Sequence, residues 1–278
     1  MLIAVQGCAH GELERIYTSI GELEDEHSVK VDLLLVCGDF QAVRNQQDLA
    51  TMACPQKYKA INSFYKYYSG EKVAPVLTVF IGGNHEAASH NWQLYHGGWA
   101  APNIYFLGYA GVVTVGGVRI AGLSGIYNRR YYHNGHFEAP PYSADTMRSA
   151  YYVRELEVFR LSQLRRPIDV LLTHDWPQGV ALHGDAPDLF RRKPFLRREV
   201  EDGSLGSPAA TELLQRLRPT YCFSAHMHVK FAAALPHADG SVTRFLSLDK
   251  CVPGRDFLQL LRVEGDGTSP VLRYDAEW

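Results

Sequence analysis

Polar side chains that can hold a metal ion follow several apolar runs of this sequence. Each stands just after the carboxyl end of a run of strand length, and the set is His10, Asp39, Asn84, His174, His226 and His228. Imidazoles, a carboxylate and an amide suit divalent cations such as zinc, iron or manganese. Asp39 is the only acidic member, so it is the candidate to bridge two ions. Pairs of ions of this kind are typical of phosphate-ester hydrolysis.

Each of these residues also has an ordinary structural explanation. A lone histidine after a strand is commonly a loop residue, Asp39 could form a turn, and Asn84 after two glycines could occupy a left-handed turn. His226 and His228 would lie well apart on a regular strand, so both reach one site only if the chain bends there. Five strand ends that deliver only nitrogen and oxygen ligands to one edge nevertheless favour a site.

Short apolar runs predict the strands that carry these residues. Runs of aliphatic residues without polar alternation are typical of strands covered on both faces. They occupy residues 2–7, 31–38, 76–83, 168–175 and 220–226. Residues 12–27 repeat their apolar side chains at helical spacing, which predicts a βαβ unit at the start of the chain.

Two hairpins complete the predicted fold class. Residues 111–125 form two alternating runs joined by Gly116 and Gly117, and residues 231–248 show a second pattern of this kind. Hairpins mixed with crossover units favour an α/β fold with two packed mixed sheets and helices outside, a four-layer α/β/β/α sandwich.

Three polar stretches interrupt the regular elements, at residues 41–72, 126–150 and 183–206. Loops of this length inside a compact domain are usually functional or disordered. We expect one catalytic domain over residues 1–278, with an insertion at about 126–150 and a C-terminal strand segment at about 230–278.

Composition narrows the class of protein. The 278 residues are 46% hydrophobic and carry a net charge of −2, which excludes a uniformly basic nucleic-acid coat and leaves RNA contacts to local patches. Five scattered cysteines indicate free thiols in a reducing compartment. No apolar run approaches the roughly 20 residues that span a bilayer. We therefore expect a soluble intracellular protein without membrane contact.

The motifs resemble the pattern DxH, GD, GNHE, H and GHxH of the calcineurin-like metallophosphoesterases. They stand here as Cys8-Ala9-His10, Gly38-Asp39, Gly83-Asn84-His85-Glu86, His174 and Ala225-His226-Met227-His228. Cys8 replaces the usual first aspartate and Ala225 the usual glycine. Within the superfamily, a cysteine at this position is a feature in which the chain resembles the RNA lariat debranching enzymes. The same resemblance is carried by the stretches GCAHGELERIY, VCGDFQAVRN, GHFEAPPY and FSAHMHVKF. The resemblance covers essentially the whole chain.

The resemblance implies a reaction, a substrate and a location. The reaction is hydrolysis of the 2′,5′-phosphodiester bond at the branch point of excised intron lariats by a metal-activated hydroxide. The partner is then branched lariat RNA, and the expected location is the nucleus.

The resemblance also implies roles for the site residues. Two divalent ions would be held by two ligand sets that share one carboxylate: His10, Asp39 and His228, and Asp39, Asn84, His174 and His226. His85 follows a ligand directly, so it is the candidate to protonate the leaving oxygen or to stabilise its charge. The expected catalytic residues are His85, Asp39 and Asn84.

Cys8 leaves the identity of the ions open between Fe2+, Zn2+ and Mn2+. As a thiolate ligand it would favour zinc or ferrous iron, whereas as a thiol it would leave one ion more weakly held. A third explanation is a small buried thiol that fills space. Asp175, next to His174, is either a partner behind the ligands or a loop residue.

The insertion at 126–150 is the segment expected to recognise substrate. Single-stranded or branched RNA is held by aromatic stacking and arginine contacts. The segment supplies both kinds of side chain, in Arg129, Arg130, Tyr131, Tyr132, His136 and Phe137. The alternative is a solvated loop with packed aromatics. A basic cluster within residues 191–198 contacts phosphate, serves nuclear import or is simply a charged surface.

Two other functions compete with this interpretation. One is a metallophosphoesterase that acts on another phosphodiester or on a phosphoprotein. The other is a binding scaffold like the retromer subunit of the same fold, in which the ligands should be eroded. Here every ligand position except Cys8 is filled and His85 is present, which favours an enzyme.

Overall fold

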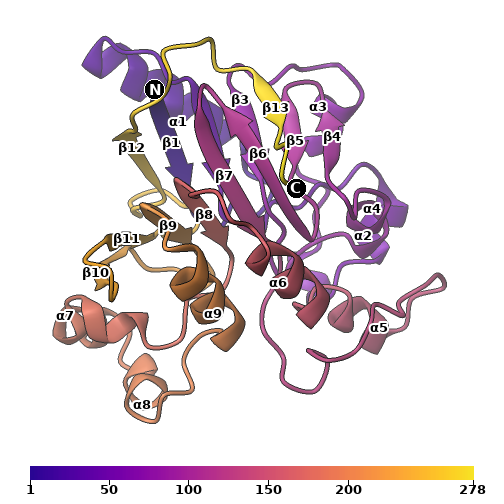
Figure 1. Ribbon diagram of the computed structural model, residues 1–278. Coiled ribbons are helices and arrows are strands. Elements are labelled where there is room, and N and C mark those ends of the chain that lie inside the picture. The colour runs from indigo at the N-terminus through magenta and orange to yellow at the C-terminus, as the bar shows by residue number, and fades with distance from the viewer.

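Two β-sheets form the centre of the fold, in a computed structural model that describes residues 1–278 (Figure 1). The first sheet contains β1 (Leu2–Gln6), β2 (Leu33–Val36), β3 (Leu77–Phe80), β4 (Gly98–Ala101), β5 (Ile104–Phe106) and β12 (Leu258–Arg262). The second contains β6 (Ala110–Val115), β7 (Val118–Leu123), β8 (Val170–Thr173), β9 (Tyr221–Ser224), β10 (Phe231–Pro236), β11 (Val242–Ser247) and β13 (Leu272–Tyr274). The spatial orders are β12-β1-β2-β3-β5-β4 and β10-β11-β9-β8-β7-β6-β13.

Helices cover the outer faces of both sheets and fill the connections. They are α1 (Leu13–His27), α2 (Gln46–Ala50), α3 (Phe64–Tyr68), α4 (Ala88–Gln93), α5 (Ala144–Ser149), α6 (Glu155–Ser162), α7 (Ala186–Arg192), α8 (Leu196–Glu201) and α9 (Pro208–Leu217). Two short 3-10 helices are η1 (Gln56–Tyr58) and η2 (Val180–His183). None of the helices combines the length and apolar character needed to cross a bilayer.

The buried side chains divide into layers, which confirms the predicted α/β/β/α sandwich. In β1, Ile3 and Val5 pack toward the second sheet, whereas Leu2 and Ala4 pack with the apolar face of α1. In β8 the alternation repeats, because Leu171 packs on the side of α6 and α9. Both faces of these strands are covered, and this is why their sequences lack polar alternation.

The five predicted core strands and both hairpins are confirmed. β1, β2 and β3 run parallel, as do β7, β8 and β9, so their carboxyl ends point the same way within each sheet. The hairpin of β6 and β7 turns at Gly116 and Gly117, both at positive φ, and β10 pairs antiparallel with β11.

The three polar stretches are more ordered than the sequence predicts. Residues 41–72 contain α2, η1 and α3, residues 126–150 contain α5, and residues 183–206 contain α7 and α8. These elements are too short for a periodic pattern, which needs windows of about 11 to 18 residues. For the same reason the sequence did not reveal α4 or α6, and it did not reveal the short strands β4 and β5. The C-terminal strand segment expected at about 230–278 contains β10 to β13, of which the sequence located only the hairpin of β10 and β11.

The C-terminal residues join both sheets. β12 pairs antiparallel with β1, and β13 pairs antiparallel with β6. A chain segment after residue 257 therefore completes an edge of each sheet. How residues 1–278 divide into domains stays a prediction.

Candidate metal centre

The predicted ligands meet where strands of both sheets end. Asp39, after β2, lies between two histidines: its Oδ2 is 3.6 Å from His10 Nε2, and its Oδ1 is 3.4 Å from His174 Nε2. His10 Nε2 is 3.3 Å from His228 Nε2, and His174 Nε2 is 3.2 Å from Asn84 Oδ1. The carboxylate therefore has one oxygen toward each of the two ligand sets that the resemblance implies.

His226 belongs to the second of these groups. Its ring lies 5.1 Å, centroid to centroid, from that of His174. His226 and His228 have φ of 61° and 50°, so the chain leaves the extended conformation directly after β9. The bend that the sequence required is present, and it turns both side chains toward one site.

Left-handed backbone is concentrated at this edge. Of nine non-glycine residues with positive φ, four are ligand candidates: His10, Asp39, His226 and His228. L-residues rarely adopt this conformation, and such strain persists where the surrounding structure enforces it, commonly at functional sites.

Two glycines make room for the ligands. A Cβ on Gly38, which has φ of 101°, would lie 2.3 Å from His174 Nδ1. A Cβ on Gly83 would lie 2.2 Å from Asp39 Oδ1. Any side chain at either position would displace a ligand candidate, which explains the glycines in the GD and GNHE motifs.

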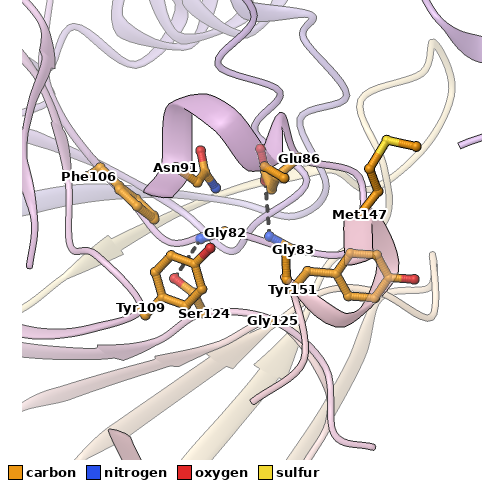
Figure 2. Close-up of a pocket in the computed structure, with 12 residues that line it drawn as sticks. Gly82, Gly83, Glu86, Asn91, Phe106, Tyr109, Ser124, Gly125, Met147 and Tyr151 are labelled. Atoms are coloured by element: carbon orange, nitrogen blue, oxygen red, sulfur yellow. Dashed lines mark hydrogen bonds between the residues drawn. The ribbon is translucent and has the colours of Figure 1, made fainter. Parts of the chain in front are cut away.

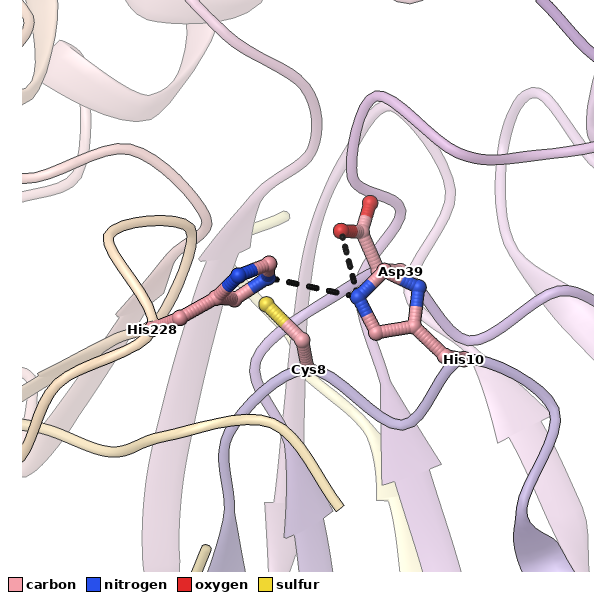
Figure 3. Close-up of side chains that lie close together, drawn as sticks. All are labelled: Cys8, His10, Asp39 and His228. Atoms are coloured by element: carbon pink, nitrogen blue, oxygen red, sulfur yellow. Dashed lines mark hydrogen bonds and ion pairs between the residues drawn. The ribbon is translucent and has the colours of Figure 1, made fainter. Parts of the chain in front are cut away.

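Cys8 lies beside the first ligand group. The potential ligand atoms of Cys8, His10, Asp39 and His228 all lie within 4.8 Å of one another, and Figure 3 shows the four side chains converging. Cys8 Sγ accepts a hydrogen bond from the His226 backbone N–H at 3.3 Å. Burial and the Asp39 carboxylate raise the pKa of the Cys8 thiol, so a thiolate here requires a nearby cation.

The protonation states of the donors fit divalent cations. Burial, the largest influence, lowers the pKa of His174 to about 4 and that of His228 to about 3, so both imidazoles are neutral at pH 7. Burial would raise the pKa of Asp39, but His174 and His10 outweigh it and hold the pKa below its usual range. The contacts among these nitrogen and oxygen atoms are mostly longer than good hydrogen bonds. Deprotonated donors that converge without saturating one another are what a metal ion needs.

Glu86 ties the two loops that carry ligands. Its buried carboxyl group accepts hydrogen bonds from the backbone N–H groups of Phe40 at 2.7 Å, Gln41 at 2.8 Å and Gly83 at 3.0 Å. Burial and the nearby Asp39 raise the pKa of Glu86 to about 8, whereas the three N–H donors favour its charged form. Asp39 Oδ1 in turn accepts from the His85 N–H at 2.9 Å. The sequence contains Glu86 in the GNHE motif, but its spacing gives no sign of this role.

Two neighbours of His10 complete its surroundings. Gln41 Nε2 lies 3.2 Å from His10 Nδ1, a contact that the sequence analysis missed. The His85 ring lies edge-on to the His10 ring, 5.3 Å between centroids, and is partly exposed. A phosphate group bound at the ligands can therefore contact His85.

A narrow cavity lies beside the ligand loops (Figure 2). Gly83 and Glu86 line it from the ligand side, and Ser124 lines it from the second sheet. Met147 and Tyr151 contribute the opposite wall, from the end of the segment 126–150 and just beyond it. The cavity thus separates the ligand loops from the segment expected to recognise substrate.

The structure does not bring the six residues predicted to bind substrate into the ligand cluster. Arg129, Arg130 and Phe137 are exposed, and Tyr132 is half-buried. Tyr131 is only 8% exposed and stacks on Tyr152, and the His136 side chain is 6% exposed. Base stacking on Tyr131 or His136 is therefore not supported, because their rings are covered by other protein groups.

The segment 126–150 nevertheless starts directly beside the ligands. Gly125 N–H donates to the Gly82 carbonyl at 2.9 Å, and Tyr127 N–H donates to Asp175 Oδ2 at 3.4 Å. Asp175 also accepts from the Trp176 N–H at 2.9 Å. Its carboxylate thus fixes backbone at the start of the segment.

Three of the five cations in the basic cluster at 191–198 pair with acidic neighbours. Arg191 and Arg192 pair with Asp188, and Arg197 lies 3.9 Å from Glu201. These contacts favour a charged surface over a dedicated phosphate site.

A different cation, Lys250, lies near the ligands and was not predicted. The next residue, Cys251, donates its N–H to the Cys8 carbonyl at 3.0 Å. Lys250 is also close enough to help lower the pKa of His10 and His228. Its position in the sequence, in a polar turn after β11, gave no signal.

Comparisons with known proteins agree with this geometry. A family model described as calcineurin-like phosphoesterase matches residues 1–230, and one described as lariat debranching enzyme, C-terminal domain, matches residues 240–278. A crystal structure with 15% sequence identity and a TM-score of 0.52, covering 94% of each chain, shows likeness of fold alone.

Curated relatives are much closer in sequence. The lariat debranching enzyme of Arabidopsis thaliana is 56% identical over 100% of this chain and 67% of its own length. Proteins of the same name from Danio rerio and Homo sapiens are 57% and 56% identical over 100% of this chain, but over only 50% and 52% of their own lengths. The chain thus spans about half the length of these vertebrate relatives. It belongs to the calcineurin-like phosphoesterase family and, within it, to the lariat debranching enzymes.

Proposed function

We propose that this protein hydrolyses the 2′,5′-phosphodiester bond at the branch point of lariat RNA. The observation that carries the proposal is the position of Asp39, whose two carboxylate oxygens each face a different group of potential metal ligands. Membership of the lariat debranching enzymes supports branched RNA as the substrate.

The family implies divalent metal ions, and the residues present fit them. We assign one ion to His10, Asp39 and His228, with Cys8 at its side, and the other to Asp39, Asn84, His174 and His226. Such ions, when bound, neutralise phosphate charge and lower the pKa of water toward about 7 in favourable cases. Asp39 holds the two ligand groups together because it contributes an oxygen to each.

The protein groups around the ligands then account for the remaining chemistry. Hydrolysis adds the oxygen of a water molecule to phosphorus and breaks the bond between phosphorus and the 2′ oxygen. We assign His85 to donate a proton to that leaving oxygen, since its ring is partly exposed beside His10. The products are a 2′-hydroxyl group and a 5′-phosphate.

Exposed side chains of the segment 126–150 are the proposed RNA contacts. Arg129 and Arg130 can pair with phosphate, and Phe137, 53% exposed, offers a face for base stacking. Lys250 adds a positive charge near His10 and His228. These contacts must supply the preference for a 2′,5′ linkage over a 3′,5′ linkage, because the metal ligands do not distinguish the two linkages.

A cleavage assay on metal-reconstituted protein tests the function. Purified protein is supplied with Mn2+, Fe2+ or Zn2+ and incubated with a 2′,5′-branched RNA or a linear 3′,5′ RNA, with Asp39→Ala as the blank. We expect cleavage of the branched RNA alone. Equal cleavage of both RNAs would favour a less specific phosphodiesterase, and no cleavage of any phosphodiester would favour a binding protein.

Cys8 provides a test of metal identity. We propose that Cys8 makes the two metal positions unequal and favours Fe2+ or Zn2+ at the first, because sulfur prefers softer cations. Metal content and activity of Cys8→Asp and Cys8→Ser, measured by elemental analysis and by cleavage, decide this. An unchanged metal preference in both variants would leave Cys8 as a space-filling thiol.

A nuclear location is proposed from the substrate, since intron lariats are products of splicing. Imaging of a fluorescent fusion in cells tests it. Exclusion of the fusion from the nucleus would contradict this proposal without affecting the chemistry.

A further inference from the structure

Four charged or ionisable residues form a buried cluster outside the metal centre. Glu138, Arg154 and Glu157 are 3%, 1% and 2% exposed, and His136 lies among them. Arg154 Nη2 donates to Glu138 Oε1 at 2.6 Å. His136 Nδ1 is 3.3 Å from Glu138 Oε2, and its Nε2 is 3.5 Å from Glu157 Oε1. The proposed reaction uses none of these groups.

The geometry around His136 indicates a protonated ring. A carboxylate only accepts hydrogen bonds, and a neutral imidazole carries a single N–H. Both ring nitrogens of His136 face carboxylate oxygens, so a neutral ring would point a lone pair at one of them. With the proton, the charges of Glu138, Arg154, Glu157 and His136 sum to zero.

No other positive charge is available to balance Glu157. Tyr95 donates its hydroxyl to Glu157, and the rings of Tyr95 and Tyr109 lie 5.7 Å and 4.8 Å from that of His136. Burial raises the pKa of both phenols, so they stay neutral. Tyr142, near Glu138, is likewise a phenol, and Arg160 on α6 stacks its guanidinium on Trp278. Glu157 Oε2 and His136 Nε2 have no hydrogen-bond partner.

The cluster joins the segment 126–150 to the body of the protein. His136 and Glu138 come from the segment itself, Arg154 precedes α6 and Glu157 lies within α6. Arg154 also donates to the carbonyls of Tyr131 at 2.7 Å and Ser149 at 2.9 Å, one from each half of the segment. The cluster therefore fastens both halves of the segment to the start of α6.

We propose that His136, as an imidazolium between Glu138 and Glu157, is a positioning residue that fixes the segment 126–150 for branched RNA. This inference deepens the proposed function and rests on it for its substrate. His136 acts through the segment and does not touch the RNA.

The proposal predicts a dependence on pH. Burial lowers the pKa of His136, but Glu138 and Glu157 outweigh it, and the pKa lies above its ordinary value of 6.5. A pKa raised in the folded state stabilises the segment fully below the unfolded value. The contribution is lost as pH rises through the folded pKa. Order in the segment should therefore decline on the alkaline side.

The test compares His136→Gln with a double variant and a matched control. His136→Gln removes the positive charge and leaves one carboxylate unbalanced. His136→Gln combined with Glu157→Gln restores balance between Arg154 and Glu138. His133→Gln is the control, because His133 belongs to the same segment but pairs with Glu155 of α6 at the protein surface.

Hydrogen exchange of the segment gives a readout without substrate. Backbone protection of residues 126–143 is measured at about pH 6 and about pH 9, on either side of the ordinary histidine range, and corrected for intrinsic exchange. We expect the wild type and His133→Gln to lose protection at the higher pH. His136→Gln should lack protection at both pH values, and the double variant should keep it at both.

Kinetics then connect the segment to the reaction. We expect His136→Gln to raise the KM for branched RNA roughly tenfold, as the loss of a charged hydrogen-bond partner would. Hydrolysis of bis(p-nitrophenyl) phosphate, which is too small to need the segment, should stay within about twofold, and the double variant should recover the KM.

Two results would overturn the proposal. One is unchanged protection in His136→Gln, and the other is a double variant as impaired as the single one, which would indicate direct RNA contact or simple packing. Failure of the wild type to cleave branched RNA would count against the proposed function instead, while the exchange data would still decide the role of His136.

Discussion

The metal centre and the segment 126–150 are held in place in different ways. Ligand candidates follow five strands of two sheets, and Glu86 fixes their loops through backbone N–H groups. The segment contains one short helix, α5, and is fastened by side-chain charges around Arg154 (Figure 1). Backbone hydrogen bonds in the sheets that carry the ligands do not depend on pH near neutrality, whereas the charge of His136, which fastens the segment, does. The contrast predicts a rigid chemical site beside a recognition element that conditions can loosen.

The largest effect should come from the chemical side of this contrast. His85→Gln should lower kcat on branched RNA by about 10²- to 10⁴-fold, the usual contribution of a general acid. Metal content should not change, because His85 is not an assigned ligand. A cleavage time course measures kcat, and elemental analysis measures the metal content. A variant of an exposed histidine, His27→Gln, is the control. A kcat within a few-fold of the wild type would remove His85 from the mechanism.

Glu86→Gln should weaken the metal centre without touching a ligand. The glutamine amide would point an N–H group at one of the backbone N–H groups that now donate hydrogen bonds to Glu86. We expect metal affinity to fall by about 10- to 100-fold, as for other partners behind metal ligands. Calorimetric titration with Mn2+ measures this, and Glu22→Gln on the exposed side of α1 is the control. Wild-type affinity would show that the strands alone hold the ligand loops.

A smaller effect is expected in the segment 126–150. Phe137→Ala should raise the KM for branched RNA about fivefold or more, since stacking contributes roughly 1–3 kcal/mol per base. The kcat should be unchanged, because Phe137 is neither an assigned ligand nor the assigned proton donor. Phe195→Ala, which removes another exposed phenylalanine, is the matched control. Equal KM values for both variants would argue that the segment does not stack bases.

The smallest effect is expected at Lys250. Lys250→Ala should raise KM by about twofold at low salt, and the difference should shrink as salt rises, because phosphate contacts are screened. A salt series of KM values measures the trend, with exposed Lys57→Ala for comparison. A salt-independent difference would indicate a packing role for Lys250 instead.

Much of the fold could be predicted because its central strands are local and uniform. Residues 2–5 and 170–172 are uninterrupted apolar runs, and both lie in strands whose residues are all buried. The helix at 155–162 was not predicted, because eight residues are too few to show a helical repeat of apolar side chains. β13 has an even weaker pattern and exists because β6 offers it an edge.

The candidate site was predicted to the same degree and for the same reason. Asp39 and His174 come shortly after predicted strands, and ligands gather beyond the carboxyl ends of such strands, so their meeting could be expected. His136 was misjudged because sequence shows an aromatic, basic segment but not which side chains turn inward. Its two carboxylate neighbours lie 2 and 21 positions away, and only folding brings the second one close.

The sandwich, the ligand types and the edge at which the ligands gather could all be predicted from the sequence, because apolar strand runs and the residues after them are local features. The tertiary structure alone decided which oxygen of Asp39 faces which histidine, that Glu86 fastens the ligand loops, and that His136 is enclosed by charge. Those features arise from contacts between residues that are far apart in the sequence, and no local sequence pattern predicts the distances between such residues.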